Sequence, residues 1–198
     1  MRADAKAERE TQIASAAYAL MAEKGFHGLS MLAVAKRAKA SNETLYRWYG
    51  DKLGLFRALI ERNADRVADA LDAALAERPD PRAALQILGP ALLDMLLSPQ
   101  AIALNRAAAA DASNSLGQVL AESGRGRVFP RIAALFDDLI AAELLHGPAA
   151  PAASLWVDLL VGDWQIRCAT GAMPVPDTAA RRARAEHAEA VLFLVKGG

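Results

Sequence analysis

The stretch GFHGLSMLAVAKRAKASNETLYRWYGDKLGLF, residues 25–56, decides the fold. Ser30 and Ser41 are favoured N-cap residues, because a serine oxygen accepts a hydrogen bond from a backbone N–H of a helix's first turn. They predict short helices over 31–38 and 42–49, separated by a brief turn. Two short helices across a tight turn form a helix-turn-helix, whose second helix enters the major groove of DNA.

The second short helix has two different faces. At 100° per residue, Leu45 and Tyr49 share the face that packs inward, whereas Glu43 and Arg47 lie on the opposite face. Carboxylate, guanidinium, amide, hydroxyl and phenol groups on and beside this outward face are those that read base edges and bind phosphates. The alternative is an ordinary solvated face beside a core leucine, and the surrounding motif favours the DNA-binding interpretation.

This stretch resembles the DNA-binding domain of the TetR/AcrR family of bacterial transcriptional regulators. The resemblance covers about the first quarter of the chain, in register and without gaps. It extends back into a first helix through Ile13, Ala16, Ala17 and Leu20. The matching positions of the motif itself are Gly25, Phe26, Ser30, Val34, Ala35, Ala38, Ser41, Thr44, Leu45, Tyr46, Tyr49, Asp51 and Lys52.

Three positions depart from the family pattern. Lys39 stands where the family has glycine, so a non-glycine residue is expected in the left-handed region, at a cost of about 1 kcal/mol. Leu29 replaces a threonine, and Trp48 replaces a histidine or tyrosine. We expect the last two changes to alter contacts with phosphates.

The resemblance implies that both short helices contribute to a DNA-binding face. Thr44, Tyr46 and Lys52 are expected to bind phosphates. Glu43 and Arg47 are one turn apart, so they can pair on the free helix, and on DNA they can read a cytosine and a guanine. The predicted DNA-binding residues are Ser30, Met31, Ser41, Asn42, Glu43, Thr44, Tyr46, Arg47, Trp48 and Lys52.

Composition sets broader limits on the 198-residue chain. It is 54% hydrophobic and rich in alanine, which favours an all-α fold. The charged N-terminus has no apolar signal region, and no stretch approaches the roughly 20 apolar residues of a membrane span, so we expect a cytoplasmic protein without a membrane partner. A lone Cys168 excludes an intrachain disulfide and a multi-cysteine metal site.

Further helices are expected along the chain. A frayed arm should precede the first helix, and residues 113–126 should form a polar, glycine-rich loop with one turn at most. The resemblance implies a three-helix helix-turn-helix domain, residues 1–55, joined by a long helix to a helical ligand-binding and dimerisation domain, residues 56–198. The expected helices are 9–24, 31–38, 42–49, 52–77, 82–97 with a bend or break at Gly89-Pro90, 99–111, 126–145, 152–170 and 178–195.

Catalytic motifs are missing from the sequence. It contains neither a G-x-S-x-G elbow nor a glycine-rich nucleotide loop. Glu143 and His146 form one E-x-x-H pair, whereas a di-iron bundle needs two such pairs and further glutamates. We therefore predict no enzyme activity, no cofactor and no metal.

Aromatic and sulphur-containing side chains are spread over the later helices. A plain core uses such residues, whereas helical bundles also place apolar ligand cavities among them. The resemblance favours a small-molecule cavity. Asp163 either orients a ligand there or pairs with Arg167 one turn later. The predicted pocket residues are Met95, Phe129, Phe136, Trp156, Asp163 and Trp164.

The last two expected helices carry apolar arcs too broad for one monomer to bury, which predicts a partner surface. Related regulators dimerise through an equivalent bundle. The predicted interface residues are Leu155, Leu159, Val191, Leu192 and Val195. Together these observations predict a homodimeric repressor that a small, mainly apolar ligand releases from a palindromic operator in double-stranded DNA. The alternatives are an enzyme that uses the helical body, or a scaffold protein that keeps the fold without regulated DNA binding.

Overall fold

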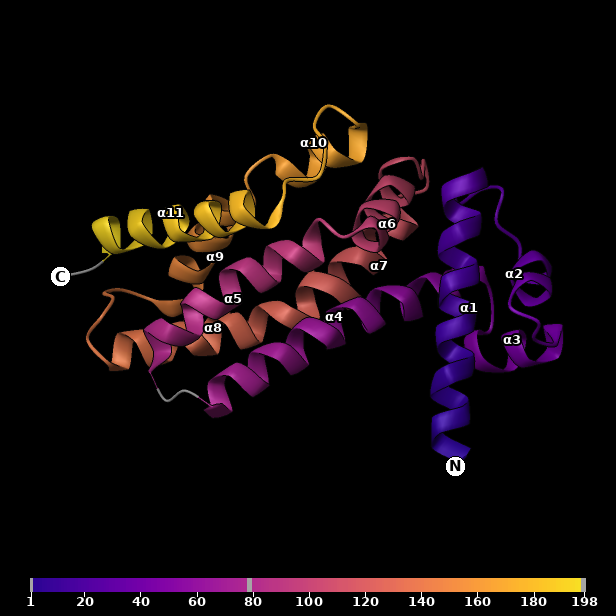
Figure 1. Ribbon diagram of the computed structural model, residues 1–198, viewed down its shortest axis with the longest axis horizontal. Coiled ribbons are helices and arrows are strands. Elements are labelled where there is room, and N and C mark those ends of the chain that lie inside the picture. The colour runs from indigo at the N-terminus through magenta and orange to yellow at the C-terminus, as the bar shows by residue number, and fades with distance from the viewer. Residues whose placement is uncertain (1, 78–79, 197–198) are drawn as a thin grey trace.

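The computed structural model describes residues 2–77 and 80–196, and every regular element in those ranges is helical (Figure 1). The all-α prediction is therefore confirmed. The N-terminal helices, in indigo and purple in Figure 1, stand at one end of the molecule and across the long bundle. The helices are α1 Arg2–Lys24, α2 Met31–Arg37, α3 Asn42–Tyr49, α4 Lys52–Glu77, α5 Pro81–Leu96, α6 Pro99–Ala109, α7 Ser115–Leu120, the π-helix η1 Ala121–Arg125, α8 Gly126–Ala141, α9 Ala149–Val161, α10 Trp164–Thr170 and α11 Thr178–Lys196.

The helix-turn-helix forms as its capping residues predict. Ser30 Oγ accepts from the N–H of Ala33 at 3.2 Å, and Ser41 Oγ accepts from the N–H of Thr44 at 3.0 Å. Leu45 is fully buried against α1 and α2, so the inward face of α3 is the predicted one. Its opposite face is left free at the end of the molecule.

Helix α1 begins well before Thr11, so the predicted frayed arm is wrong for the described residues. Its first turns contain stabilising contacts one helical turn apart. Lys6 Nζ lies 3.6 Å from Glu10 Oε1, and Thr11 Oγ1 donates to the carbonyl of Ala7 at 2.8 Å. Lys6 Nζ also lies 5.9 Å from the ring centroid of Trp48, which ties this end of α1 to α3.

Long helix α4 starts where the sequence predicts, because the N–H of Gly54 donates to Asp51 Oδ1 at 2.8 Å. Its first turns lie in the N-terminal core and its later turns lie among the helices of the body. The N-terminal core also contains Leu104 and Ala107 of α6 and Leu116 and Val119 of α7. Helices α6 and α7 therefore complete the core beneath the helix-turn-helix.

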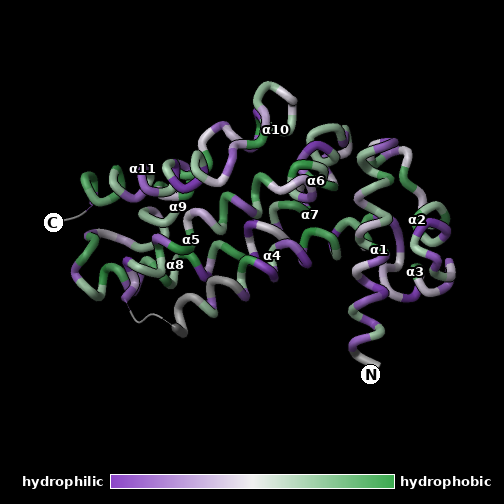
Figure 2. The backbone as a smooth tube through the Cα atoms, viewed as in Figure 1, coloured by the Kyte–Doolittle hydropathy of each residue, from purple (hydrophilic) through white to green (hydrophobic). Residues whose placement is uncertain are grey.

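The body packs α4, α5, α8, α9 and α11 around a second apolar core (Figures 1 and 2). Phe136 and Trp156 are its large aromatic residues, with ring centroids 5.9 Å apart. Helix α5 continues through Gly89-Pro90, so of the two predicted outcomes, a bend or an interruption, the interruption is wrong. Gly89 is needed for close packing there, since a Cβ would lie 2.8 Å from Cβ of Ala185 in α11.

Residues 115–125 are helical, so the predicted loop is wrong. Asp111 organises the start of this segment: its carboxylate accepts from the N–H of Leu116 at 2.9 Å and from the hydroxyl of Ser113 at 2.8 Å. Leu116 and Val119 are buried, and this burial outweighs the weak helix propensity of a glycine- and serine-rich sequence.

Two other helix boundaries differ from the prediction. Helix α8 ends at Ala141 rather than at residue 145, and Glu143 then has a positive φ of 58°. The expected helix over 152–170 divides into α9 and α10 at Gly162, whose φ of 49° suits a residue without a side chain. Arg184 Nε donates to the carbonyl of Leu160 at 3.1 Å and so caps the end of α9.

No single helix within the described ranges is both long and apolar enough to cross a membrane. Helices α5 and α6 reach that length and composition only together, and a bend of 58° separates them.

Candidate DNA-binding face and ligand cavity

The outward face of α3 is open to solvent. Asn42, Glu43, Tyr46 and Arg47 are exposed, while Thr44 is half-buried and its hydroxyl lies 2.8 Å from Ser41 Oγ. The expected Glu43–Arg47 ion pair is not formed within the described part of the chain. Both side chains therefore extend into solvent from one face of a helix that enters DNA in other helix-turn-helix proteins.

Two of the predicted DNA-binding residues, Met31 and Trp48, take part in the packing of the domain. Met31 is only 5% exposed and lies in the core with α1, so the prediction that its side chain contacts DNA is wrong. Trp48 is half-buried beside Tyr49, with ring centroids 6.3 Å apart. Burial of the neighbouring Tyr49 raises the pKa of its hydroxyl to about 12.

Lys52 is half-buried at the start of α4. Its ammonium donates to the carbonyl of His27 at 3.3 Å and lies 4.1 Å from the ring centroid of Phe26. Desolvation lowers its pKa below the ordinary lysine value. Lys52 thus fixes the turn between α1 and α2 to α4, beside the same end of the molecule as α3.

The turn between α2 and α3 has the backbone conformation that the sequence predicts. Lys39 adopts a φ of 51° in the left-handed region. Arg9 of α1 donates from Nη1 to the carbonyl of Lys39 at 3.0 Å and to that of Ala38 at 3.5 Å. The guanidinium therefore binds two carbonyls just beyond the end of α2, where a cation also stabilises the negative end of the helix dipole.

A cavity of about 560 Å³ lies in the body between α4, α5, α6, α7, η1, α8, α9 and the start of α10. Its wall is mainly apolar, and its polar groups are few. This size and composition are those of small-molecule sites in helical proteins. The lining residues are Ile60, Asn63, Ala64, Leu92, Met95, Leu96, Ala101, Leu104, Asn105, Gly117, Leu120, Ala121, Gly124, Arg125, Val128, Phe129, Ile132, Val157, Asp158, Val161, Gly162 and Gln165.

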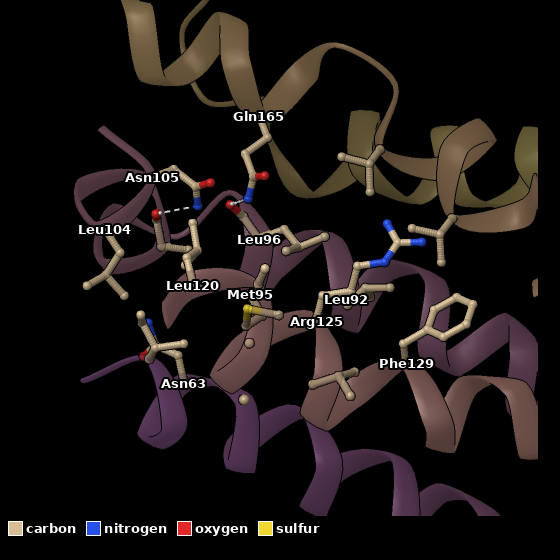
Figure 3. A pocket seen from close by; sticks show the side chains of 18 of the residues that line it. Asn63, Leu92, Met95, Leu96, Leu104, Asn105, Leu120, Arg125, Phe129 and Gln165 are labelled. Carbon is tan, nitrogen blue, oxygen red and sulfur yellow. Dashed lines mark hydrogen bonds between the residues drawn. The ribbon is translucent and has the colours of Figure 1, made fainter. Parts of the chain in front are cut away.

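The cavity includes only part of the predicted pocket. Met95 and Phe129 line it (Figure 3). Phe136 and Trp156 do not, because they are at most 1% exposed and fill the core. Asp163 lies on the surface, where its carboxylate is 3.7 Å from Arg167 Nη1, as one of the two sequence interpretations held. Trp164 also lies outside the cavity, under the guanidinium of Arg184 at 5.4 Å from the ring centroid.

Three amides line the cavity and were not predicted: Asn63, Asn105 and Gln165. Asn105 Nδ2 donates to the carbonyl of Ala101 at 2.9 Å, and Gln165 Nε2 donates to the carbonyl of Leu96 at 3.0 Å (Figure 3). A single polar residue on an apolar helix face was the available signal, and it is not specific. A stronger sequence signal for the cavity wall was the helical spacing of Leu92, Met95 and Leu96, because this spacing marks the inward face of α5.

The predicted dimer residues fall into three groups. Leu192 is fully buried in the core of its own chain, so its predicted place in an interface is wrong. Leu155, Leu159 and Val191 are half-buried. Val195 is 62% exposed, next to Leu194 at 85%, and the apolar C-terminal turns of α11 are visible in Figure 2. Leu194, which was not predicted, is thus the most exposed large apolar residue among those described.

Both the N-terminal and the C-terminal parts of the chain match known protein families. Residues 13–59 match the family described as bacterial regulatory proteins of the tetR family, and residues 83–195 match the AefR-like transcriptional repressor C-terminal domain. The HTH-type transcriptional activator FasR of Mycolicibacterium smegmatis is 30% identical over 89 residues, which are 45% of this chain and 41% of FasR. This alignment therefore spans less than half of the relative.

Solved structures resemble nearly the whole chain. A TetR-family regulator from Mesorhizobium loti has a TM-score of 0.80 at 26% identity, covering 97% of this chain and 98% of its own. A TetR regulator from Agrobacterium tumefaciens has a TM-score of 0.73 at 27% identity, covering 96% and 94%. The chain belongs to the TetR family of bacterial transcriptional regulators, with a C-terminal domain of the AefR-like repressor type.

Proposed function

We propose that this regulator is a homodimeric repressor that a small, mainly apolar molecule releases from a palindromic operator in the cytoplasm. The observation that carries the proposal is the position of α4. Its first turn holds Lys52 against the helix-turn-helix, and Ile60, Asn63 and Ala64 further along the same helix line the cavity. One rigid element therefore contacts both the DNA-binding domain and the space that a ligand would fill.

The DNA-binding part of the proposal is supported by the exposed groups of α3. Arg47 offers a guanidinium that can bind guanine, and Glu43 offers a carboxylate that can accept from cytosine. Thr44, Tyr46 and Lys52 are proposed to bind phosphates, and Ser30, Ser41 and Asn42 to complete the contacts. Repression is supported by the AefR-like repressor domain, while FasR is named an activator, so the sign of regulation needs its own measurement.

Dimerisation is supported by the apolar surface on α9 and α11. Leu194 and Val195 extend into solvent at the end of α11, and Leu155, Leu159 and Val191 are half-buried nearby in the fold. Burying such a surface against a second copy removes apolar area from water. A two-fold dimer would also present two α3 helices to half-sites about 34–36 Å apart.

Ligand release is supported by contacts between the cavity wall and the first half of α4. Gly124 of η1 lines the cavity, and a Cβ there would lie 3.4 Å from Cγ2 of Ile60. The adjacent Ser123 is buried, and Arg57 Nη1 donates to its hydroxyl at 3.4 Å. We propose that α4 has one position when the protein binds DNA and another when it does not. A ligand that binds these two states with unequal affinity will shift α4, change the spacing of the two α3 helices in a dimer, and so change the affinity for DNA.

Selection from a pool of random duplexes by mobility shift tests this proposal. We expect the full chain to select a palindrome, and transcription from a promoter that carries it to fall when the protein is added. Binding to all duplexes alike would contradict sequence-specific regulation and favour a scaffold role. Turnover of a small molecule without any selection would favour an enzyme.

A further inference from the structure

The side-chain amides of Asn105 and Gln165 in the cavity wall each have one atom that already binds the protein and one atom that does not. Asn105 and Gln165 each use the side-chain nitrogen to donate to a backbone carbonyl, of Ala101 at 2.9 Å and of Leu96 at 3.0 Å. Only the NH2 group of an amide can donate to a carbonyl, so these contacts fix the orientation of both amides. Figure 3 shows both nitrogens on their carbonyl acceptors and both oxygens turned away from them.

The two amide oxygens are therefore the groups that Asn105 and Gln165 offer to the cavity. Neither oxygen accepts a hydrogen bond from any residue in the described ranges. Both residues line the cavity and both are half-buried, which places an acceptor of α6 and an acceptor of α10 in one largely apolar space. Asp158, exposed at the wall formed by α9, adds a carboxylate that is also an acceptor.

The other donor-bearing side chains of the cavity wall are Asn63 and Arg125, and the NH2 groups of Asn105 and Gln165 each keep a second N–H. Nδ2 of Asn63 has almost no accessible surface and no hydrogen-bond partner among the described residues. Arg125 is exposed, with its guanidinium 4.9 Å from the ring centroid of Phe129 and Nη2 donating to Ser154 Oγ at 3.2 Å. An anionic ligand would thus meet two amide oxygens in the wall, with the exposed carboxylate of Asp158 and the exposed guanidinium of Arg125 both at the solvated part of the wall.

We propose that the effector is an uncharged, largely apolar molecule with a hydrogen-bond donor, such as a phenol or an alcohol, held by Asn105 and Gln165. This inference rests on the proposed role of the cavity as the effector site. A hydroxyl donates to these acceptors, whereas an ether or a carboxylate leaves them without a donor. The preference for a ligand with a donor therefore comes from two amide oxygens that accept no hydrogen bond from the described residues.

Three probes of matched shape test the inference: para-octylphenol, para-octylanisole and para-octylbenzoate. Their binding to the full-length protein is measured by isothermal titration calorimetry at pH 7. We expect the phenol to bind about ten-fold more tightly than the anisole, and the benzoate to bind more weakly than either. Equal binding of phenol and anisole, tightest binding of the benzoate, or binding of none of the three would overturn the inference.

Substitutions in the cavity wall test which residues cause the preference for the phenol over the anisole. Asn105→Leu and Gln165→Leu should each reduce the preference for phenol over anisole several-fold. Gln118→Leu is the matched control, because Gln118 is an exposed amide on α7 outside the cavity wall, and it should retain the parent preference. If the benzoate binds to the parent protein most tightly and Arg125→Met abolishes this binding, the site is one for anions and the inference is wrong. The comparison of probes on the parent protein remains decisive if a variant fails to fold.

Operator release is measured beside binding with each probe. If the anisole or the benzoate binds best and still releases the operator, the proposed repressor stands and the ligand class is wrong. If the phenol binds best but leaves operator affinity unchanged, the ligand class stands and ligand release is wrong.

Discussion

Arg9 and Lys39 together hold the turn that orients α3. Lys39 has a φ of 51°, a conformation that disfavours a residue with a side chain, and Arg9 Nη1 donates to its carbonyl at 3.0 Å. Tyr18 of α1 adds a second contact, because its hydroxyl donates to the carbonyl of Leu59 at 3.3 Å, and desolvation raises its pKa to about 12. Single side chains of α1 therefore fix both α2 and α4.

Replacing Lys39 by glycine should stabilise the protein. Glycine populates the left-handed region without steric cost, so the free energy of unfolding should rise by about 0.5–1 kcal/mol in urea titrations. Lys36→Gly is the matched control: Lys36 lies within α2, where glycine should destabilise by about 1 kcal/mol. Equal destabilisation by both substitutions would show that the turn does not strain Lys39.

Glu43→Ala should separate base reading from general attraction to DNA. Removing an exposed carboxylate near phosphates should tighten binding to random duplexes, while the preference at one base pair in each half-site is relaxed. Affinities for the selected palindrome, its single-base variants and random duplexes test this at one fixed salt concentration. Glu186→Ala is the control, because Glu186 is an exposed glutamate of α11 far from α3, and it should leave all of these affinities unchanged. Weaker random binding would show that Glu43 supports the fold instead.

Helices that are specified locally were predictable, and those that depend on distant contacts were not. Ser30 and Ser41 cap α2 and α3 from within the same few residues. The break after α9 depends on Arg184, whose bond to the carbonyl of Leu160 spans 24 residues of sequence. Helix α7 exists because the burial of Leu116 and Val119 outweighs local propensity, so residues 115–125 looked like a loop.

The cavity was harder to predict than the helix-turn-helix for a related reason. Large aromatic residues were expected to line it, yet Phe136 and Trp156 are the side chains that fill the core most completely. The polar groups that distinguish the cavity, Asn105 and Gln165, come from helices far apart in sequence. Only the packing of α6 against α10 brings them to one wall, with Arg106 Nε donating to the carbonyl of Ala169 at 2.8 Å.

The connection between α6 and α7 should give a pH-dependent contribution to stability. The N–H of Leu116 and the hydroxyl of Ser113 stabilise the carboxylate of Asp111 and lower its pKa from 3.8 to about 2. A lowered folded-state pKa stabilises the protein above about pH 3.8, and this contribution is lost as the pH falls towards 2. The difference in unfolding free energy between the parent and Asp111→Asn should therefore narrow between pH 5 and 3. A constant difference would mean that the charge of Asp111 does not matter.

At the scale of the whole molecule, the DNA-binding face and the apolar end of α11 lie at opposite ends (Figure 1). A dimer formed through α9 and α11 would hold two α3 helices at a distance set by the bundles between them. Operator binding should then depend on residues far from DNA, because a single half-site contact binds weakly.

Leu194→Asp combined with Val195→Asp should produce monomers. Two carboxylates would be buried without partners at the proposed interface, which costs far more than the apolar contact gains. Sedimentation should show the monomer, and affinity for the selected palindrome should fall while circular dichroism stays helical. Ile166→Asp is the control, because Ile166 is 55% exposed on α10 and outside the proposed interface. A double variant that remains dimeric would move the interface elsewhere.

The linkage between cavity and operator is the central claim, and one paired titration tests it most directly. Affinity for the selected palindrome is measured by fluorescence anisotropy with and without saturating para-octylphenol, and affinity for the phenol is measured with and without saturating palindrome. We expect the phenol to weaken operator binding about 5–150-fold, and the operator to weaken phenol binding by the same factor, as thermodynamic linkage requires. Operator affinity that stays unchanged while the phenol occupies the protein would contradict the account of a ligand-released repressor.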